Sequence, residues 1–173
     1  MDVEGTSVSG IWWRHIPSGG DVHYRPDPPA DSRWQRGEVI DAIYLADAEE
    51  TAWAEWYRAL AESGLPPQQA LPRDLWRWEI SLPDVADLST PEKLERVGLQ
   101  TPTPSRRRWP AFQEVGEILH ADGWLALLAP SAARPEGRVL CVFREEQTVA
   151  GATPIPPPRK FDEPPSVPRG MTT

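Results

Sequence analysis

The stretch that decides the fold is residues 42–66, AIYLADAEETAWAEWYRALAESGLP. Its first five residues are apolar or aromatic and predict a short strand. Asp47 is placed for an N-cap, with Glu50 three residues later as in a capping box. Gly64 and Pro66 are signals that end a helix. A strand that leads directly into a helix indicates a protein of mixed α and β structure.

The rest of the chain supplies further strands and helices in mixed order. The period-two alternation of Trp76–Leu82 is the clearest pattern of a half-buried strand. We also predict strands at Gly10–Ile16, Trp124–Leu128 and Arg138–Phe143, and helices that begin at Thr90-Pro91 and at Pro110. Because the two kinds of element are interspersed rather than strictly alternating, the expected class is α+β. We expect a single domain with a mixed central sheet flanked by helices.

Composition narrows the classes of function. The chain has 173 residues and a formal net charge of −8, which argues against direct nucleic-acid binding. Met1 is followed by acidic residues and by no apolar segment of a secretory signal, and no run is long enough to span a membrane. Cys141 stands alone in an apolar run and is expected to be a buried, inert thiol. A cytoplasmic protein fits these features.

Residues 151–173 differ from the rest. They contain seven prolines and almost no large apolar side chains. Such a segment is expected to remain an extended, disordered tail outside a domain of residues 1–150. Its removal after Ala150 should then leave stability unchanged. A polyproline II ligand at Pro154–Arg159 is the alternative for part of it.

Glu55 is the first candidate functional residue. On a helical wheel it shares one polar stripe with Thr51, Arg58 and Glu62, while the other faces of the helix are mostly apolar. This stripe is either the solvated face of the helix or the wall of a polar pocket.

Four more residues are candidates, each with an ordinary structural alternative. Arg33 lies in a polar loop and Tyr44 in the strand before the helix of Glu55, where a paired loop arginine and a core aromatic are the alternatives. Arg14 follows two tryptophans in a strand, where a charge needs a partner or a ligand. Ser131 follows a strand among small residues and is otherwise a turn serine.

Metal and cofactor chemistry finds no support in the sequence. The histidines, His15, His23 and His120, do not have the paired spacing of metal ligands. No glycine-rich phosphate loop is present. We therefore expect no metal and no bound cofactor.

These candidates occur in an order that resembles the RES-domain family, over about residues 11 to 144. The resemblance rests on Arg14, Arg33-Trp34 with Gly37, Tyr44-Leu45-Ala46, Ala52, Glu55, Gln113 with Gly116, and Pro130-Ser131-Ala132. Two positions depart from the family pattern: Gln35 stands where asparagine is frequent, and His15 where several members have tyrosine. Both substitutions bear on how a substrate is oriented.

The resemblance implies a fold similar to ADP-ribosyltransferases and an NAD-consuming toxin of a bacterial toxin–antitoxin pair. NAD would be the substrate, its nicotinamide–ribose bond would be cleaved, and inorganic phosphate or water would be the acceptor. The expected partner is a helix-turn-helix antitoxin, and a homo-oligomer is compatible with the pattern. The alternatives are an ADP-ribosyltransferase that modifies a protein and a non-catalytic interaction module with the same fold.

The resemblance also assigns roles to residues. Glu55, Arg33 and Ser131 would be the catalytic set, and Arg14, Tyr44 and His15 would bind the substrate. Planar arginines suit the pyrophosphate of NAD, because a guanidinium can donate two parallel hydrogen bonds to phosphate oxygens. A carboxylate at Glu55 would favour the positive charge that develops on the ribose when the bond to nicotinamide breaks.

Overall fold

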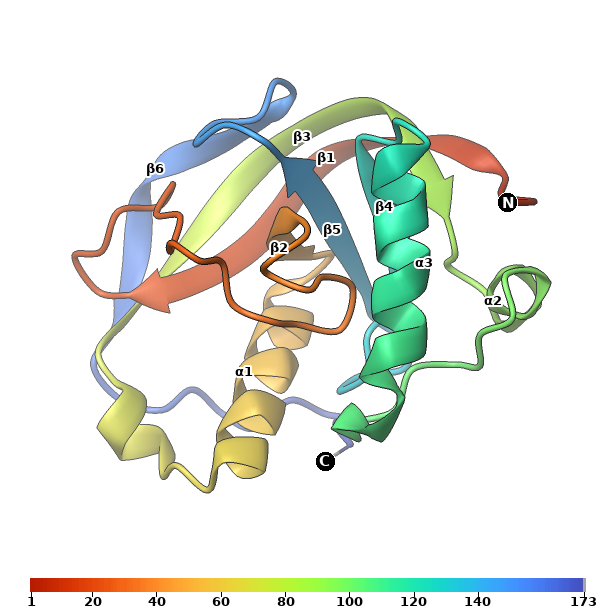
Figure 1. The fold of residues 1–173 in the computed structure, drawn as a ribbon. Coiled ribbons are helices and arrows are strands. Elements are labelled where there is room, and N and C mark those ends of the chain that lie inside the picture. The colour runs from red at the N-terminus through yellow and green to blue at the C-terminus, as the bar shows by residue number, and fades with distance from the viewer. Residues whose placement is uncertain (173) are drawn as a thin grey trace.

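The computed structural model describes residues 1–172, which form a mixed six-stranded sheet with helices packed against it (Figure 1). This confirms the predicted α+β class and the single domain. The elements in chain order are β1 (Gly5–Pro17), β2 (Asp41–Ala46), α1 (Glu49–Ser63), the 3₁₀ helix η1 (Pro67–Ala70), β3 (Arg73–Asp87), α2 (Pro91–Arg96), the 3₁₀ helix η2 (Arg106–Arg108), α3 (Trp109–Ala121), β4 (Ala126–Pro130), β5 (Arg138–Arg144) and β6 (Ala152–Phe161).

The sheet is closed into a ring. Its strand order is β1-β2-β5-β4-β3-β6, and β1 also pairs with β3. The β3–β4 pairing is parallel and the others are antiparallel. β1 joins β2 at one register position, Trp13 opposite Ala46. This narrow junction places the end of β1 beside the start of α1.

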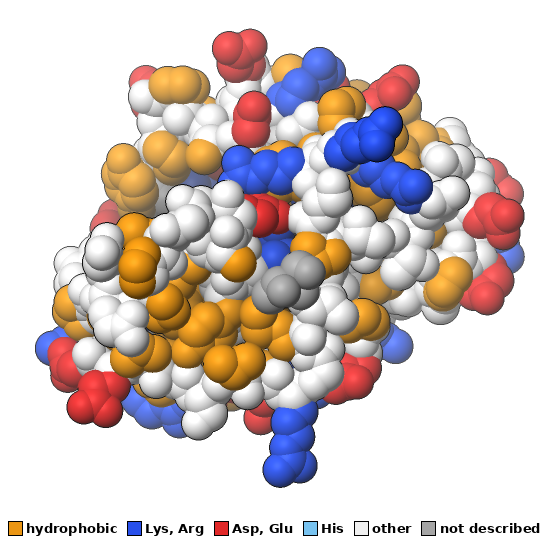
Figure 2. Space-filling view, turned by 90° about the horizontal axis from the view of Figure 1, so that it is seen from below, with side chains coloured by type: hydrophobic (Ala, Val, Ile, Leu, Met, Phe, Trp, Pro, Cys, Tyr) orange, Lys and Arg blue, Asp and Glu red, His pale blue; other side chains and the backbone are white. Residues whose placement is uncertain are grey.

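One face of the molecule is hollowed. Seen from below, a depression lies near the middle of this face, with basic and acidic side chains inside it (Figure 2). Charged side chains in a depression need partners or a ligand, so this face is the place to look for a site.

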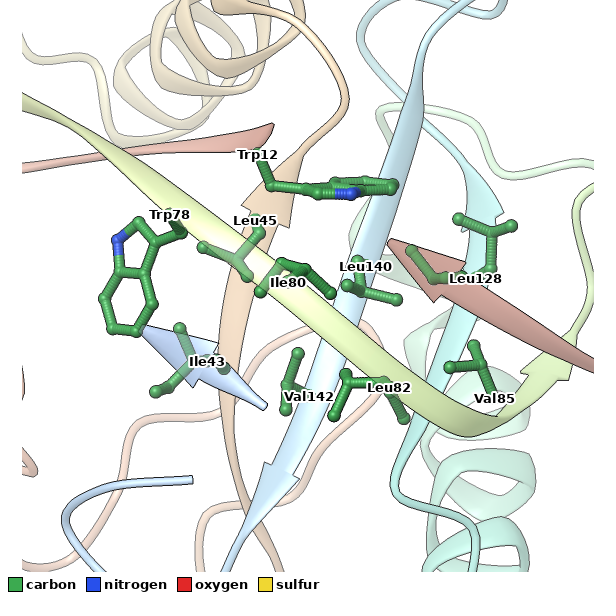
Figure 3. Packing of buried hydrophobic residues seen from close by; sticks show 13 residues of the cluster. Trp12, Ile43, Leu45, Trp78, Ile80, Leu82, Val85, Leu128, Leu140 and Val142 are labelled. Carbon is green, nitrogen blue, oxygen red and sulfur yellow. The ribbon is translucent and has the colours of Figure 1, made fainter. Parts of the chain in front are cut away.

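The interior of the ring is filled by the apolar side chains that alternate along its strands. Figure 3 shows them gathered between β3 on one side and β2, β5 and β4 on the other. Ile43 and Leu45 of β2 meet Leu140 and Val142 of β5 here, as the period of two requires. The other members of this core are Val8, Trp12, Trp78, Ile80, Leu82, Val85, Ala126, Leu128 and Ala152.

The outward positions of the same strands pack under the helices. Cys141 and Phe143 of β5 lie in a second cluster with Phe112, Val115 and Leu119 of α3. Burial raises the pKa of the Cys141 thiol to about 12, which agrees with the inert thiol predicted from the sequence. A third cluster packs Trp53, Trp56 and Leu60 of α1 against Leu75 of β3. Helices α1 and α3 thus pack against the sheet through two separate apolar clusters.

The expectation of a disordered tail from residue 151 is wrong for residues 152–161. They form β6, which pairs with β3 between Arg73 and Ile80. β6 is the outermost strand on this part of β3, and an edge strand tolerates prolines because it needs few of its own N–H groups. The composition rule failed because it counts apolar side chains, whereas an edge strand is held mainly through its backbone.

The chain after β6 returns to the body of the protein. The Tyr57 hydroxyl of α1 donates a hydrogen bond to the Pro165 carbonyl, and Pro168 is buried. The Thr172 amide donates to the Ala133 carbonyl over 2.7 Å. Residues 162–172 thus run past α1 to the loop that follows β4.

The ends of α1 were partly predicted. Gly64 ends the helix in the left-handed conformation, with φ +64°, as its sequence position indicates. The expectation for the N-cap was wrong, because Ala48 occupies that position and no side chain caps the helix. The Asp47 Oδ1 atom is buried without a hydrogen-bond partner, since the chain enters the helix one residue later than the motif requires.

Candidate active site

A cavity of about 500 Å³ lies in the hollowed face, between the end of β1, the loop before β2, α1 and the loop after β4. Its walls combine indole rings with arginine side chains. Five of the six residues proposed from the sequence line it: Arg14, His15, Arg33, Tyr44 and Glu55. Ser131 does not line the cavity. The other charged and aromatic residues of its walls are Trp13, Trp34, Trp56, Arg58, Arg73 and Trp109.

The loop that carries Arg33 is held against α3. Gln113 Nε2 donates to the Ser32 carbonyl over 2.9 Å. Gly116 faces the Trp34 carbonyl so closely that a Cβ atom would lie 2.1 Å from this oxygen. The Tyr44 hydroxyl accepts from the Trp34 amide over 3.1 Å and from the Ser32 hydroxyl. Four side-chain and backbone contacts therefore determine where Arg33 points.

Arg33 is a buried cation with spare hydrogen-bonding capacity. The residue is 7% exposed, and its Nη2 donates to the Thr103 carbonyl over 2.7 Å. Its Nη1 is buried without a partner. Burial, and then the neighbouring charge of Arg58, lower the pKa of Arg33 to about 10, so the side chain is still protonated at neutral pH. A buried cation with an unused donor is suited to an anionic ligand.

Glu55 is fixed by contacts to both of its carboxylate oxygens. Oε1 accepts from the Ser131 hydroxyl over 2.6 Å and from the Ala132 amide over 3.1 Å. Oε2 accepts from Arg58 Nε over 2.8 Å. Arg58 also pairs with Glu62, one turn further along α1. Of the stripe proposed from the sequence, Glu55 and Arg58 line the cavity as a polar pocket wall, whereas Thr51 and Glu62 do not.

Ser131 lies behind Glu55. The residue is 1% exposed, and its Oγ also accepts from the amides of Ala133 and Arg134, over 3.2 and 3.0 Å. The same short loop is bound from outside by Thr172, whose hydroxyl and amide donate to the carbonyls of Ala132 and Ala133. Ser131 is placed to orient the Glu55 carboxylate rather than to touch a ligand.

Arg14, His15 and Tyr44 occupy three different environments. Arg14 Nη1 donates to the Val22 carbonyl over 3.1 Å, and burial lowers the pKa of its guanidinium to about 10. The His15 ring stacks on Trp53, with ring centroids 5.1 Å apart. Tyr44 lines the cavity with its ring while its hydroxyl faces the Arg33 loop, and burial raises the pKa of that hydroxyl well above its ordinary value.

Sequence reasoning missed two arginines of the cavity. Arg58 is in contact with Glu55, and its position on the same helical stripe was a usable signal. Arg73 is the first residue of β3, far from the motif residues in sequence, and no local pattern indicated it. Among the ion pairs of residues 1–172, none joins Arg14, Arg33 or Arg73 to a carboxylate. The cavity thus has an excess of positive charge.

Comparison with known proteins identifies this arrangement. The chain matches the RES domain over residues 11–164. It belongs to the RES-domain family. The matched range includes every residue named above for the cavity, and it extends through β6, so this strand is part of the RES domain.

Two curated relatives come from mycobacteria. The "Probable NAD(+) phosphorylase Rv3189" of Mycobacterium tuberculosis is 26% identical over 138 residues, which are 79% of this chain and 66% of the relative. The "NAD(+) phosphorylase MbcT" of Mycobacterium bovis is 31% identical over 105 residues, 58% of this chain and 55% of the relative. This chain therefore spans between about half and two thirds of the length of these relatives.

The fold also matches a solved structure. The crystal structure of the M. tuberculosis MbcT–MbcA toxin–antitoxin complex superposes with a TM-score of 0.78 and 23% sequence identity. The match covers 91% of this chain and 86% of the compared chain. It establishes that the two chains share a fold.

Metal sites and membrane-spanning helices were also considered for the described part of the chain. Within residues 1–172, no group of three or more His, Cys, Asp and Glu side chains is arranged to hold a metal ion. No helix of the same residues has the length and apolar character needed to cross a membrane.

Proposed function

We propose that this protein consumes NAD by breaking the bond between nicotinamide and ribose, with inorganic phosphate as the acceptor. The observation that carries the proposal is a cavity lined by a firmly held carboxylate, Glu55, and by three arginines that form no ion pair with a carboxylate of residues 1–172. Membership of the RES-domain family and the names of the two phosphorylase relatives support it.

The chemistry of NAD suits this cavity. Its pyrophosphate carries two negative charges, which the guanidinium groups of Arg14 and Arg33 can bind through charge-assisted hydrogen bonds. Its rings can pack on the indoles of the walls, such as Trp56 and Trp109. The unused Nη1 of Arg33 then gains an acceptor, which offsets the cost of burying it.

The proposed reaction gives Glu55 a direct role. When the C1′–N bond breaks, both electrons go to the nicotinamide nitrogen, whose positive charge is neutralised. Positive charge develops on the ribose, and the Glu55 carboxylate favours it. A phosphate oxygen then forms the new bond to C1′, so the products are nicotinamide and ADP-ribose 1-phosphate. Ser131 keeps the carboxylate in place, and Tyr44 positions the Arg33 loop.

The partner is proposed on the basis of the structural match to MbcT, which was solved in a complex with MbcA, its antitoxin. We propose that this chain is likewise the toxin of a pair, acting in the cytoplasm on the NAD pool. The helix-turn-helix character of the antitoxin is part of the same proposal. Co-expression with the product of a neighbouring small gene, followed by purification of a complex, tests it.

A Glu55→Gln variant provides the test of the proposed site. The change removes the charge but keeps nearly the same volume, so the variant should fold, bind NAD and release no nicotinamide. The matched control is Glu50→Gln, at an exposed position in the first turn of the same helix. Nicotinamide release by Glu55→Gln at the parent rate would show that Glu55 is not the reacting carboxylate.

A further inference from the structure

His15 is held by Arg73, which contacts both its ring and its backbone carbonyl. Its Nδ1 lies 2.7 Å from Arg73 Nη2, and the same Nη2 donates to the His15 carbonyl over 3.4 Å. Arginine has no acceptor, so Nδ1 must be the acceptor and the ring proton must lie on Nε2. His15 Nδ1 is therefore not free to bind a substrate.

The protonation state of His15 agrees with this geometry. Burial, and then the charges of Arg73 and Arg14, lower the pKa of His15 to about 3. The imidazole is neutral at neutral pH and accepts a hydrogen bond from Arg73 without repelling it. Stacking on Trp53 at an interplanar angle of 6° fixes the plane of the ring.

Arg73 has a hydrogen-bond donor that is not used. It lines the cavity, and its Nε atom is buried without a hydrogen-bond partner. Burial lowers the pKa of Arg73 to about 10, so it remains a cation at neutral pH. Arg14 is close enough that its pKa is lowered by the charge of Arg73. Two cations share this part of the cavity wall, while Arg58 and Arg33 lie near Glu55.

Arg144 is a buried arginine with a structural role, and its partners can be compared with those of Arg73. Its side chain is 2% exposed and pairs with Asp41 over 2.7 Å. It also donates to the carbonyls of His23 and Tyr24. Arg73 is partly buried and has no such carboxylate within the described residues, although moving part of a cation out of water without a partner is costly. An anionic ligand in the cavity would supply the missing partner.

We propose that Arg73, oriented by His15, binds a phosphate oxygen of the substrate together with Arg14. The inference rests on the proposed function, since it takes the dinucleotide as the anion. It makes Arg73 a binding residue that no local sequence pattern indicates. It also makes His15 a positioning residue, which acts on the substrate through Arg73.

The test compares NAD affinity by calorimetry in the inactive Glu55→Gln background. Arg73→Gln should weaken NAD binding about ten- to a hundredfold, the effect of losing one charge-assisted hydrogen bond. His15→Phe keeps the stacking surface but removes the acceptor and should weaken binding several-fold, about three to ten times. His15→Asn, which restores an acceptor oxygen, should recover part of the loss. Arg77→Gln, at an exposed position of the same strand, is the control and should bind like the parent.

Inorganic pyrophosphate is the second probe, and it separates the two proposals. If the Glu55→Gln background does not bind NAD, the proposed function fails. Pyrophosphate binding that is lost in Arg73→Gln would then still support the anion site. The inference is overturned if the background and Arg73→Gln bind NAD with equal affinity. Where NAD is not bound at all, it is overturned if Arg73→Gln binds pyrophosphate as well as the background does. Melting temperatures identify variants that fail to fold, and Arg73→Lys, which keeps the charge, is the substitute if Arg73→Gln is one of them.

Discussion

Ser131→Ala tests how the carboxylate of Glu55 is held. The Ser131 hydroxyl donates to Glu55 Oε1 over 2.6 Å, and the amides of Ala132 and Ala133 also approach this oxygen, at 3.1 and 3.4 Å. Removing the hydroxyl deletes the shortest of the three contacts and leaves the other two. The carboxylate should then lose its fixed orientation without leaving the cavity.

The size of the effect follows from the hydrogen bond that is lost. A hydrogen bond to a charged group contributes about 1.5–3 kcal/mol, so kcat should fall about ten- to a hundredfold. The Michaelis constant for NAD should change little, because Ser131 does not line the cavity. The Arg134 amide loses its acceptor and the Ala133 amide loses one of its two, so the free energy of unfolding should fall by about 1–3 kcal/mol.

The assay is nicotinamide release at several NAD concentrations, with urea unfolding measured in parallel. Ser63→Ala is the matched control, since the exposed Ser63 hydroxyl, on the helix that carries Glu55, donates to the Ala59 carbonyl. It should leave both kcat and stability close to the parent values. A Ser131→Ala variant with the parent kcat would refute the positioning role, and a raised Michaelis constant with unchanged kcat would indicate contact with the substrate.

Three further predictions address the arginine loop, the last strand and the histidine of the cavity wall. Arg33→Lys should weaken NAD binding about ten- to a hundredfold, because lysine cannot donate two parallel hydrogen bonds. Arg36, in an exposed pair with Glu117, is the control, and Arg36→Lys should not weaken binding. Calorimetry in the inactive Glu55→Gln background measures both affinities. Truncation after Ala150 removes β6 and should lower the melting temperature by several degrees or prevent folding, contrary to the expectation from composition; an unchanged melting temperature would mean that the β3–β6 pairing adds no stability. Folding depresses the pKa of His15 from 6.5 to about 3, so the stability that this residue contributes is complete above pH 6.5 and is lost as pH falls toward 3. In urea titrations, the free energy of unfolding of His15→Asn should depend on pH less steeply than that of the parent, by about one proton. Equal pH dependence of the two proteins would show that folding does not hold the ring neutral.

Local patterns predicted the fold well where they coincide with local structure. The strand before α1 and the end of α1 at Gly64 follow from residue types within one element. β3 continues beyond the predicted Trp76–Leu82 to Asp87, where the alternation is interrupted and the pairing with β1 maintains the strand. β6 was missed for the same reason, since its pairing partner lies far away in the sequence.

The candidate site shows the same division. Arg33, Tyr44 and Glu55 lie close in sequence, on a loop, a strand and a helix that follow one another, and they meet in one cavity. Arg73 reaches the cavity through the long β1–β3 pairing, in which it lies opposite Pro17, and such a register cannot be read from either strand alone. The place of Ser131 behind Glu55 depends on the same kind of long-range packing.

The most direct test of the account is the fate of NAD with and without inorganic phosphate. Purified protein should release nicotinamide rapidly only when phosphate is present, and the other product should be ADP-ribose 1-phosphate, identified by mass and by its third phosphorus signal. The Glu55→Gln variant should produce neither compound. Free ADP-ribose formed equally well without phosphate would mean that water, and not phosphate, is the acceptor. Labelling of a protein would indicate a transferase. NAD that stays intact under every condition would contradict the account.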